Sequence, residues 1–249
     1  MTSKMTVDDL KELVALSNRT LHHVGLVTTS GHASHRIPGT DRVLIKRNGV
    51  LQRSIAITET VDILTMDLEG NHLDGEGTLP VEWPLHTEIY KARADVMGVV
   101  HTHQKWASAF GVAGVRIRPV LHPGLASSAV LPIPIYDESY DIVRTVQQGK
   151  VAAEVFGQSI ACHLRNHGMV FGAASLEAAV VAAINLEYQA QVTWHAMQLA
   201  PSEEIQEIPM LFMRNMVEQR REGRVGNTWN YYKWLDKNIH SARLRQVQQ

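Results

Sequence analysis

Near the start of the chain, apolar residues recur every three or four positions, which is the spacing of one face of an α-helix. Asp8 and Asp9 come first in this segment, where the positive end of the helix dipole favours carboxylates. The pattern predicts an amphipathic surface helix over residues 6–24. Its apolar positions include Leu10, Leu13, Val14, Leu21 and Val24.

Helical spacing and short β-rich runs alternate through the middle of the chain. Extended stretches on either side of the turn at residues 38–41 predict a β-hairpin. Residues 69–80, rich in Gly, Asp and Asn, predict an exposed loop. Further strands are predicted over 96–103 and 129–135, and either a strand pair or a strand and a turn within 160–171. Further helices are predicted over 82–94, 105–112, 141–156 and 175–199.

This alternation predicts an α/β layered domain. Several strand pairs are joined by turns too short for a crossover, so we expect a mixed or mostly antiparallel sheet. Residues 1–200 would form this domain. Residues 201–249 differ in character, because Trp229, Tyr231, Tyr232 and Trp234 stand among basic residues. This segment predicts a helical extension that packs either on its own core or on a neighbouring subunit.

Composition narrows the class of protein. The 249 residues are 45% hydrophobic and 20% charged, with a formal net charge of -1, as in ordinary globular proteins. The chain has no clustered excess of Lys and Arg, so we expect no nucleic-acid partner. No apolar run approaches the roughly 20 residues that would span a membrane. Cys162 is the only cysteine, so we expect no intrachain disulfide and a cytoplasmic location.

The chemistry is expected among the 13 histidines. His101 and His103 end a predicted strand, and residues i and i+2 lie on the same face, roughly 6 to 7 Å apart along the strand. Both imidazoles could therefore reach one metal ion. His167, between Asn166 and Gly168, is the best candidate for a third ligand. The spacing alone leaves open that His101 and His103 are hydrogen-bonded core residues.

A candidate acid/base stands shortly before this strand. Glu82 opens the preceding helix, and a carboxylate beside a metal can act as a general acid or base. A helix N-terminus also favours a carboxylate for purely structural reasons. His86 lies four residues on, on the same helical face as Glu82, and is expected to be a hydrogen-bonded packing residue.

Together, Glu82-Trp83, His86, the run from Gly98 to His103 and the turn at 166–168 resemble the class II aldolase/adducin family. The resemblance covers roughly residues 6–199. It implies a three-layer α/β/α fold in a homotetramer with active sites at subunit interfaces. It also implies that His101, His103 and His167 bind one divalent ion per subunit, and that Glu82 is the acid/base.

Other segments depart from the sugar-phosphate aldolases of that family. Where those enzymes cradle phosphate with small hydroxyl and backbone donors, this chain has Gly31-His32, residues 46–49 and Pro80-Val81. Residues 31–36 instead resemble the branch that decarboxylates hydroxylated aromatic acids such as dihydroxyphthalate. On a strand, His32, Ser34 and Arg36 would share one face. We expect a catalytic role for His32 and substrate contacts for Gly31, Ser34 and Arg36. The less favoured alternative for Arg36 is a surface charge on the hairpin.

These observations support three hypotheses. The first is a metal-dependent, non-oxidative decarboxylase of a hydroxylated aromatic carboxylate or dicarboxylate. The second is a sugar-phosphate aldolase, epimerase or dehydratase that uses the same ion. The third is a non-enzymatic interaction domain like the adducin head, against which the intact set of ligands argues. Zinc or manganese is the expected ion, with iron or cobalt as alternatives, because imidazole suits several metals.

Overall fold

A computed structural model describes residues 5–48, 54–122 and 131–247 of the chain. Its centre is one sheet in the order β4-β3-β2-β1-β5-β8-β7-β6, antiparallel throughout except for the β6–β7 pair. The strands are β1 (His32–Arg36), β2 (Arg42–Lys46), β3 (Ile63–Asp67), β4 (His72–Asp74), β5 (Gly98–Thr102), β6 (Ile135–Tyr136), β7 (Ala161–Leu164) and β8 (Gly168–Ala173). The mixed, mostly antiparallel sheet is as predicted.

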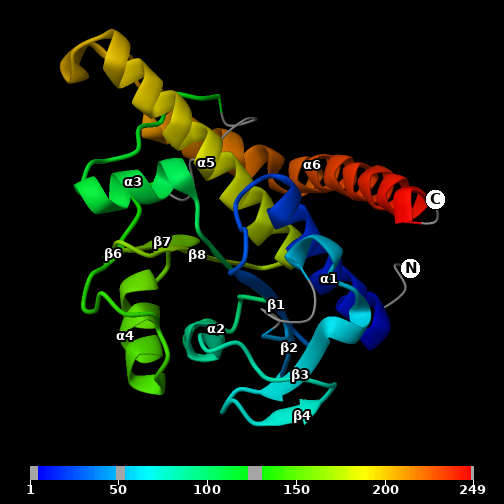
Figure 1. The fold of residues 1–249 in the computed structure, drawn as a ribbon. Helices are drawn as coiled ribbons and strands as arrows, with labels where there is room; N and C mark the ends of the chain where they lie inside the picture. Colours follow the sequence, from blue (N-terminus) through cyan, green and yellow to red (C-terminus); the bar gives the residue numbers. More distant parts are fainter. Residues whose placement is uncertain (1–4, 49–53, 123–130, 248–249) are drawn as a thin grey trace.

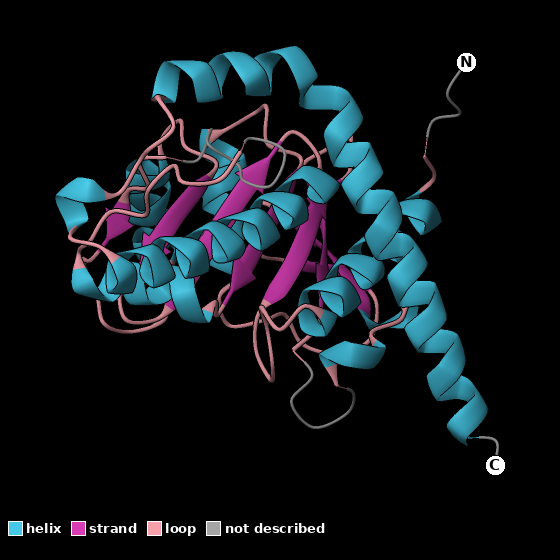
Figure 2. Cartoon of the chain, turned by 90° about the horizontal axis from the view of Figure 1, so that it is seen from above, coloured by secondary structure: helices cyan, strands magenta, loops and turns pink. Residues whose placement is uncertain are grey.

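Helices cover both faces of this sheet, which gives the three layers seen in Figure 2. Helices α1, α3 and α5 pack on one face, and α2 and α4 pack together on the other. Figure 1 shows the long α5 and α6 running past the sheet. The helices are α1 (Val7–His23), α2 (Trp83–Ala92), α3 (Lys105–Ala113), α4 (Val146–Phe156), α5 (Leu176–Leu199) and α6 (Met210–Val247). The three-layer α/β/α fold is confirmed.

Alternation along the strands divides the core into two halves. On β5, Val100 belongs to the cluster under α1 and α5, whereas Val99 belongs to the cluster under α2 and α4. Successive side chains of a strand point to opposite faces. His101 therefore lies on the same face as Val99, the face that α2 covers.

Three boundaries differ from the predictions. The predicted loop over 69–80 contains the short strand β4, which pairs with β3, a strand the sequence analysis did not predict. Helix α4 begins at Val146 instead of 141, because Thr145 and Gln148 form a capping box there. Of the strand predicted over 129–135, residues 129–130 lie outside the described residues, and only Ile135 is in a strand.

The C-terminal helix α6 packs on α1 and α5 of its own chain. A buried ion pair links it to α1: Arg19 donates from Nε to Asp236 Oδ1 at 3.0 Å, and both side chains are 7% exposed. Arg19 also donates to the carbonyl of Thr58 at 2.6 Å. The predicted division into a domain over residues 1–200 and an extension over residues 201–249 that packs on the core or on a neighbouring subunit stays a prediction.

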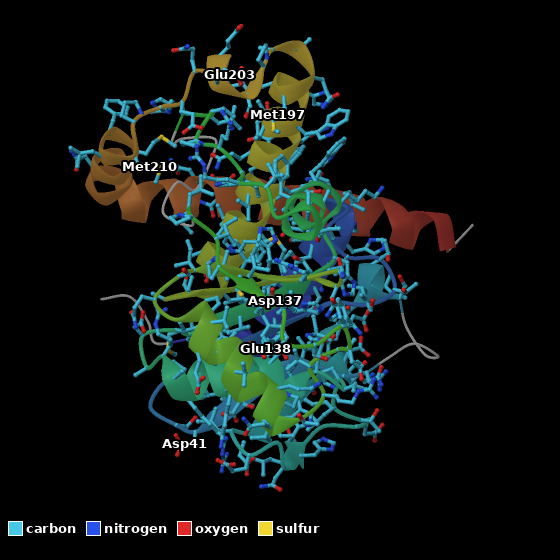
Figure 3. The ribbon with its side chains drawn as sticks, turned by 90° about the vertical axis from the view of Figure 1, so that its left-hand side faces the viewer. Asp41, Asp137, Glu138, Met197, Glu203 and Met210 are labelled. Carbon is cyan, nitrogen blue, oxygen red and sulfur yellow. The ribbon has the colours of Figure 1, made fainter. Side chains whose placement is uncertain are left out.

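The far ends of the molecule are visible in Figure 3, where Met197 and Glu203 lie opposite Asp41 of the β1–β2 turn. Within the described ranges, no helix combines the length and the apolar character that crossing a membrane requires.

The buried pair between α1 and α6 generates a stability prediction. Asp236→Asn should lower the free energy of unfolding by about 2 kcal/mol, because it removes the buried counter-ion of Arg19 and leaves the guanidinium only the more exposed Glu12, at 2.8 Å. Urea unfolding measures this change. The matched control is Asp74→Asn, which breaks the exposed Lys11–Asp74 pair at 3.2 Å and should cost less than about 1 kcal/mol. Equal costs for the two variants would contradict the assignment.

Candidate metal centre and active site

Strand β5 places the first two imidazoles. His101 is fully buried and lies directly opposite His32 in the β1–β5 register. His103 follows the end of the strand, where its backbone N–H donates to the carbonyl of Leu26 at 2.9 Å. The chain then turns into α3, whose first three N–H groups donate to the carboxylate of Glu187 on α5 at 2.9 to 3.0 Å. Hydrogen bonds to Leu26 and to Glu187 therefore fix the segment that follows the end of β5.

The β7–β8 turn places the third imidazole. Asn166 has a positive φ of 60°, which small polar residues such as Asn adopt more readily than most. A Cβ atom on Gly168 would lie 2.3 Å from the carbonyl oxygen of Thr102. Only glycine lets β8 start this close to β5. This close approach brings His167 beside His101 and His103.

The three rings converge on one point. His103 Nε2 lies 3.0 Å from His101 Nε2 and 3.3 Å from His167 Nε2. All three candidate ligand atoms lie within 4.8 Å of one another. Two imidazole nitrogens at about 2.1 Å from one ion stand about 3.0 to 3.4 Å apart. The two contacts of His103 have this spacing, so the three residues are candidates to bind a single metal ion.

The hydrogen bonding of His101 supports the same conclusion. Its Nδ1 lies 2.9 Å from the carbonyl oxygen of Met169, which only accepts, so Nδ1 carries the proton and Nε2 carries a lone pair. A metal-bound histidine commonly donates its other N–H to a carbonyl in this way. Burial lowers the pKa of His101 and His167, and lowers that of His103 to about 4. The rings are therefore neutral and able to ligate near pH 7.

Glu82 lies at the edge of this histidine cluster. One carboxylate oxygen is 3.4 Å from His101 Nε2, and the other is 3.7 Å from His167 Nε2. Glu82 is 7% exposed, and its Oε1 has no hydrogen-bond partner in the structure. Burial raises the pKa of this carboxyl, but His101, His32 and His167 lower it further, so the net shift is downward. The carboxylate is therefore ionised near neutral pH.

His32 borders the same space. Its Nε2 is 3.8 Å from Glu82, and its Nδ1 forms a 2.7 Å hydrogen bond with Nε2 of His86. Gly31, just before it, has a φ of +108°, and a Cβ atom there would lie 2.5 Å from Val27. Glycine is thus required at position 31, immediately before β1.

Ser34 and Arg36 share the face of His32 but are not brought to the histidine cluster. Ser34 is fully buried, and its hydroxyl bonds to His86 Nδ1 at 2.7 Å. The guanidinium of Arg36 donates to the carbonyl of Tyr90 on α2. The alternation of side chains along β1 predicted this shared face correctly. Each step of two residues along the strand, however, moves the side chain further from the end of β1 at which His32 lies.

His86 is a hydrogen-bonded packing residue, as expected, but the sequence analysis did not identify its partners. It packs inside the protein and joins His32 to Ser34 through both ring nitrogens. The available signal was its position four residues after Glu82, on the same face of α2. Its partner His32 lies 54 residues away in the sequence, so spacing could not reveal the contact.

Known proteins resemble this chain in sequence. Residues 11–194 match the family described as Class II Aldolase and Adducin N-terminal domain. A 3,4-dihydroxyphthalate decarboxylase from Arthrobacter keyseri is 35% identical over 225 residues, covering 84% of this chain and 90% of that protein. The protein of the same name from Terrabacter sp. is 31% identical over 172 residues, 66% of this chain and 70% of its own length.

Solved structures share the fold. An aldolase II superfamily protein from Pseudomonas syringae superimposes with a TM-score of 0.77 at 20% identity, covering 95% of this chain and 96% of that chain. An L-fuculose 1-phosphate aldolase gives a TM-score of 0.72 at 23% identity, covering 88% and 99%.

The chain belongs to the class II aldolase and adducin family. Within that family it is an enzyme of the lyase class. The hypothesis of a non-enzymatic interaction domain is therefore set aside.

The histidine cluster predicts metal binding. The purified protein should bind one divalent ion per chain, and His103→Gln should reduce the bound metal to near zero by removing the ligand between the other two. Elemental analysis after dialysis measures the ratio. His72→Gln, on the exposed strand β4, should keep the full ratio. Full metal content in the His103 variant would refute the site.

Burial of the imidazoles also predicts a pH effect on the metal-free protein. The pKa of His103 is about 4 in the folded state and about 6.5 in an unfolded chain. Between these values the unfolded state binds more protons, so stability should fall as the pH drops from 6.5 towards 4. Urea unfolding with a chelator present measures this trend. His103→Gln should make the dependence shallower, and an unchanged slope would contradict the assignment.

Proposed function

We propose that the protein is a divalent-metal-dependent, non-oxidative decarboxylase of a hydroxylated aromatic carboxylate or dicarboxylate. The proposal rests on one observation: three neutral imidazoles converge beside a buried, ionised carboxylate in a chain 35% identical to a 3,4-dihydroxyphthalate decarboxylase over most of its length. Zinc or manganese is the proposed ion, with iron or cobalt as alternatives.

Decarboxylation breaks the bond between a ring carbon and its carboxylate, and the electron pair stays on the ring. That charge is tolerable only if it can be delocalised onto an oxygen. A divalent ion held by His101, His103 and His167 supplies a Lewis acid that stabilises negative charge on a substrate oxygen. The carbon that loses CO₂ must then receive a proton.

We assign these proton movements to Glu82. Its carboxylate, ionised and without a hydrogen-bond partner on Oε1, accepts the proton of the substrate hydroxyl. It then returns this proton to the ring carbon as CO₂ leaves. The atoms and charges balance, because the product leaves with its oxygen ionised and takes its final proton from water. His32, 3.8 Å from Glu82, binds and orients the substrate beside this carboxylate.

Gly31 remains a proposed substrate contact through its backbone. Ser34 and Arg36 were expected to contact substrate as well, but their hydrogen bonds to His86 and Tyr90 favour a supporting role. The homotetramer implied by the family, with sites between subunits, and a cytoplasmic location also remain proposals.

A sugar-phosphate aldolase or epimerase is the second candidate. A probable L-ribulose-5-phosphate 4-epimerase from Mycoplasma pneumoniae is 36% identical, but over only 54% of each chain. The cations near a potential phosphate site already have partners: Arg47 pairs with Asp62 at 2.8 Å, and Lys46 donates to the carbonyl of Arg47. These contacts favour the decarboxylase.

The proposal is tested by measuring CO₂ release from a panel of hydroxylated aromatic mono- and dicarboxylates with zinc or manganese added. We expect turnover of at least one dihydroxylated dicarboxylate and loss of turnover on chelation. Fuculose and ribulose phosphates complete the panel. Rapid cleavage or epimerisation of a sugar phosphate, with no CO₂ release from any aromatic acid, would establish the second candidate instead.

Glu82→Gln tests the proposed acid/base. The amide keeps the shape of the side chain but cannot accept a proton, so kcat should fall about 10²- to 10⁴-fold while bound metal stays at the wild-type level. Steady-state kinetics measure kcat, and elemental analysis measures the bound metal. Glu154→Gln, on the exposed side of α4, should leave both unchanged. A Glu82 variant that retains wild-type kcat would exclude this role.

A further inference from the structure

Behind the site, four side chains form a continuous line of hydrogen bonds. His32 Nδ1 lies 2.7 Å from His86 Nε2, and His86 Nδ1 lies 2.7 Å from Ser34 Oγ. Ser34 Oγ in turn lies 2.8 Å from the phenol oxygen of Tyr90. We call these four residues the His32–Tyr90 chain. It runs from the active site to the interior between β1 and α2.

The interior part of this chain is shielded from water. His86 and Ser34 are fully buried, and Tyr90 is 1% exposed. A buried donor without an acceptor costs about 1 to 3 kcal/mol. Each hydrogen must therefore point at a protein acceptor, and the positions of the hydrogens can be deduced in order.

The deduction begins at Tyr90. Burial raises the pKa of this phenol, so the hydroxyl keeps its proton. Among the described residues, Ser34 Oγ is the acceptor within hydrogen-bond distance, so Tyr90 donates to it. Ser34 then has one hydrogen of its own and two possible acceptors: His86 Nδ1 at 2.7 Å and the carbonyl oxygen of Val99 at 3.5 Å. The shorter contact is the stronger bond.

The next step fixes His86. Burial lowers the pKa of this ring well below its ordinary value, so the ring is neutral and has one proton. If Nδ1 accepts from Ser34, that proton is on Nε2, which donates to Nδ1 of His32. His32 then has its own proton on Nε2, directed towards the Glu82 carboxylate 3.8 Å away. The reverse order would turn a lone pair of His32 towards an ionised carboxylate.

We propose that Ser34 and His86 are positioning residues that hold His32 in the Nε2–H tautomer, so that His32 is a hydrogen-bond donor to the substrate carboxylate. This inference rests on the proposed function and assigns different roles to Glu82 and His32. Glu82 supplies lone pairs and moves the proton, whereas His32 presents an N–H to the group that leaves.

Arg36 fixes the interior end of the His32–Tyr90 chain. Its guanidinium lies over the ring of Tyr90, 5.1 Å from the centroid, and donates to the carbonyl of the same residue. Tyr90 is thereby held against β1, where its hydroxyl meets Ser34. The direction of all three hydrogen bonds thus depends on residues of β1 and α2 and on Glu82, just before α2.

Neutron diffraction from deuterated, zinc-loaded protein tests the tautomer directly, without any assay of activity. We expect deuterium on His32 Nε2 and His86 Nε2, and the Ser34 deuteron pointing at His86 Nδ1. Deuterium on Nδ1 of His32 would overturn the proposal. This result is independent of the substrate, so it stands apart from a failure of the decarboxylase assignment, which the CO₂ assay reports.

Kinetics of Ser34→Ala test the consequence. Loss of the hydroxyl frees His86 and His32 to exchange tautomers, so kcat should fall at least tenfold while bound metal and the substrate KM change less than threefold. Ser34→Thr, which keeps the hydroxyl, should restore most of the rate. Tyr90→Phe should lose less than Ser34→Ala, because Ser34 still reaches His86.

The matched control is Ser17→Ala. Ser17 is fully buried like Ser34, but its hydroxyl bonds to the carbonyl of Leu13 within α1. This variant should keep the wild-type kcat at whatever cost in stability. If Ser17→Ala and Ser34→Ala lose the same rate, or if Ser34→Ala keeps full rate, the positioning role is wrong. Thermal unfolding of each variant identifies losses that come from misfolding.

Discussion

The proposed site depends on three imidazole nitrogens, 3.0 and 3.3 Å apart, that face one another from two segments of the sequence, residues 101–103 and residue 167. Burial of these rings opposes their protonation, so they stay neutral. The surrounding chain must hold the rings in this arrangement. The carbonyl of Met169 does so for His101, and the close approach of Gly168 to Thr102 does so for His167.

The antiparallel sheet explains why these residues meet. Strand β5 has β1 and β8 as its two neighbours and runs opposite to both. The end of β5 therefore lies beside the beginnings of β1 and β8. His32 begins β1, His101 is near the end of β5, and His167 immediately precedes β8. Glu82, just before α2, closes the group from the layer above.

Much of this arrangement could be predicted from the sequence, because it follows from local rules. The two-residue period of a strand placed His101 and His103 on one face, and the glycine after His167 marked a tight turn. Position in the sequence had already made His167 and Glu82 candidates for the third ligand and the acid/base, and the resemblance to a family strengthened both assignments. The distance of each side chain from the histidine cluster could not be predicted. Alternation placed Ser34 on the same face as His32, but it did not show that Ser34 is hydrogen-bonded to His86 in the interior. Strand β3 and the start of α4 were missed because pairing and capping decide them.

The contact between Glu187 and the first turn of α3 has a wider consequence. One carboxylate on the long helix α5 receives three backbone N–H groups immediately after His103. The ligand geometry is thus coupled to the rigidity of a 24-residue helix that lies on the other face of the sheet. Such preorganisation reduces the ordering entropy lost when an ion arrives. Affinity for the ion is in this way partly a property of a helix that contributes no ligand.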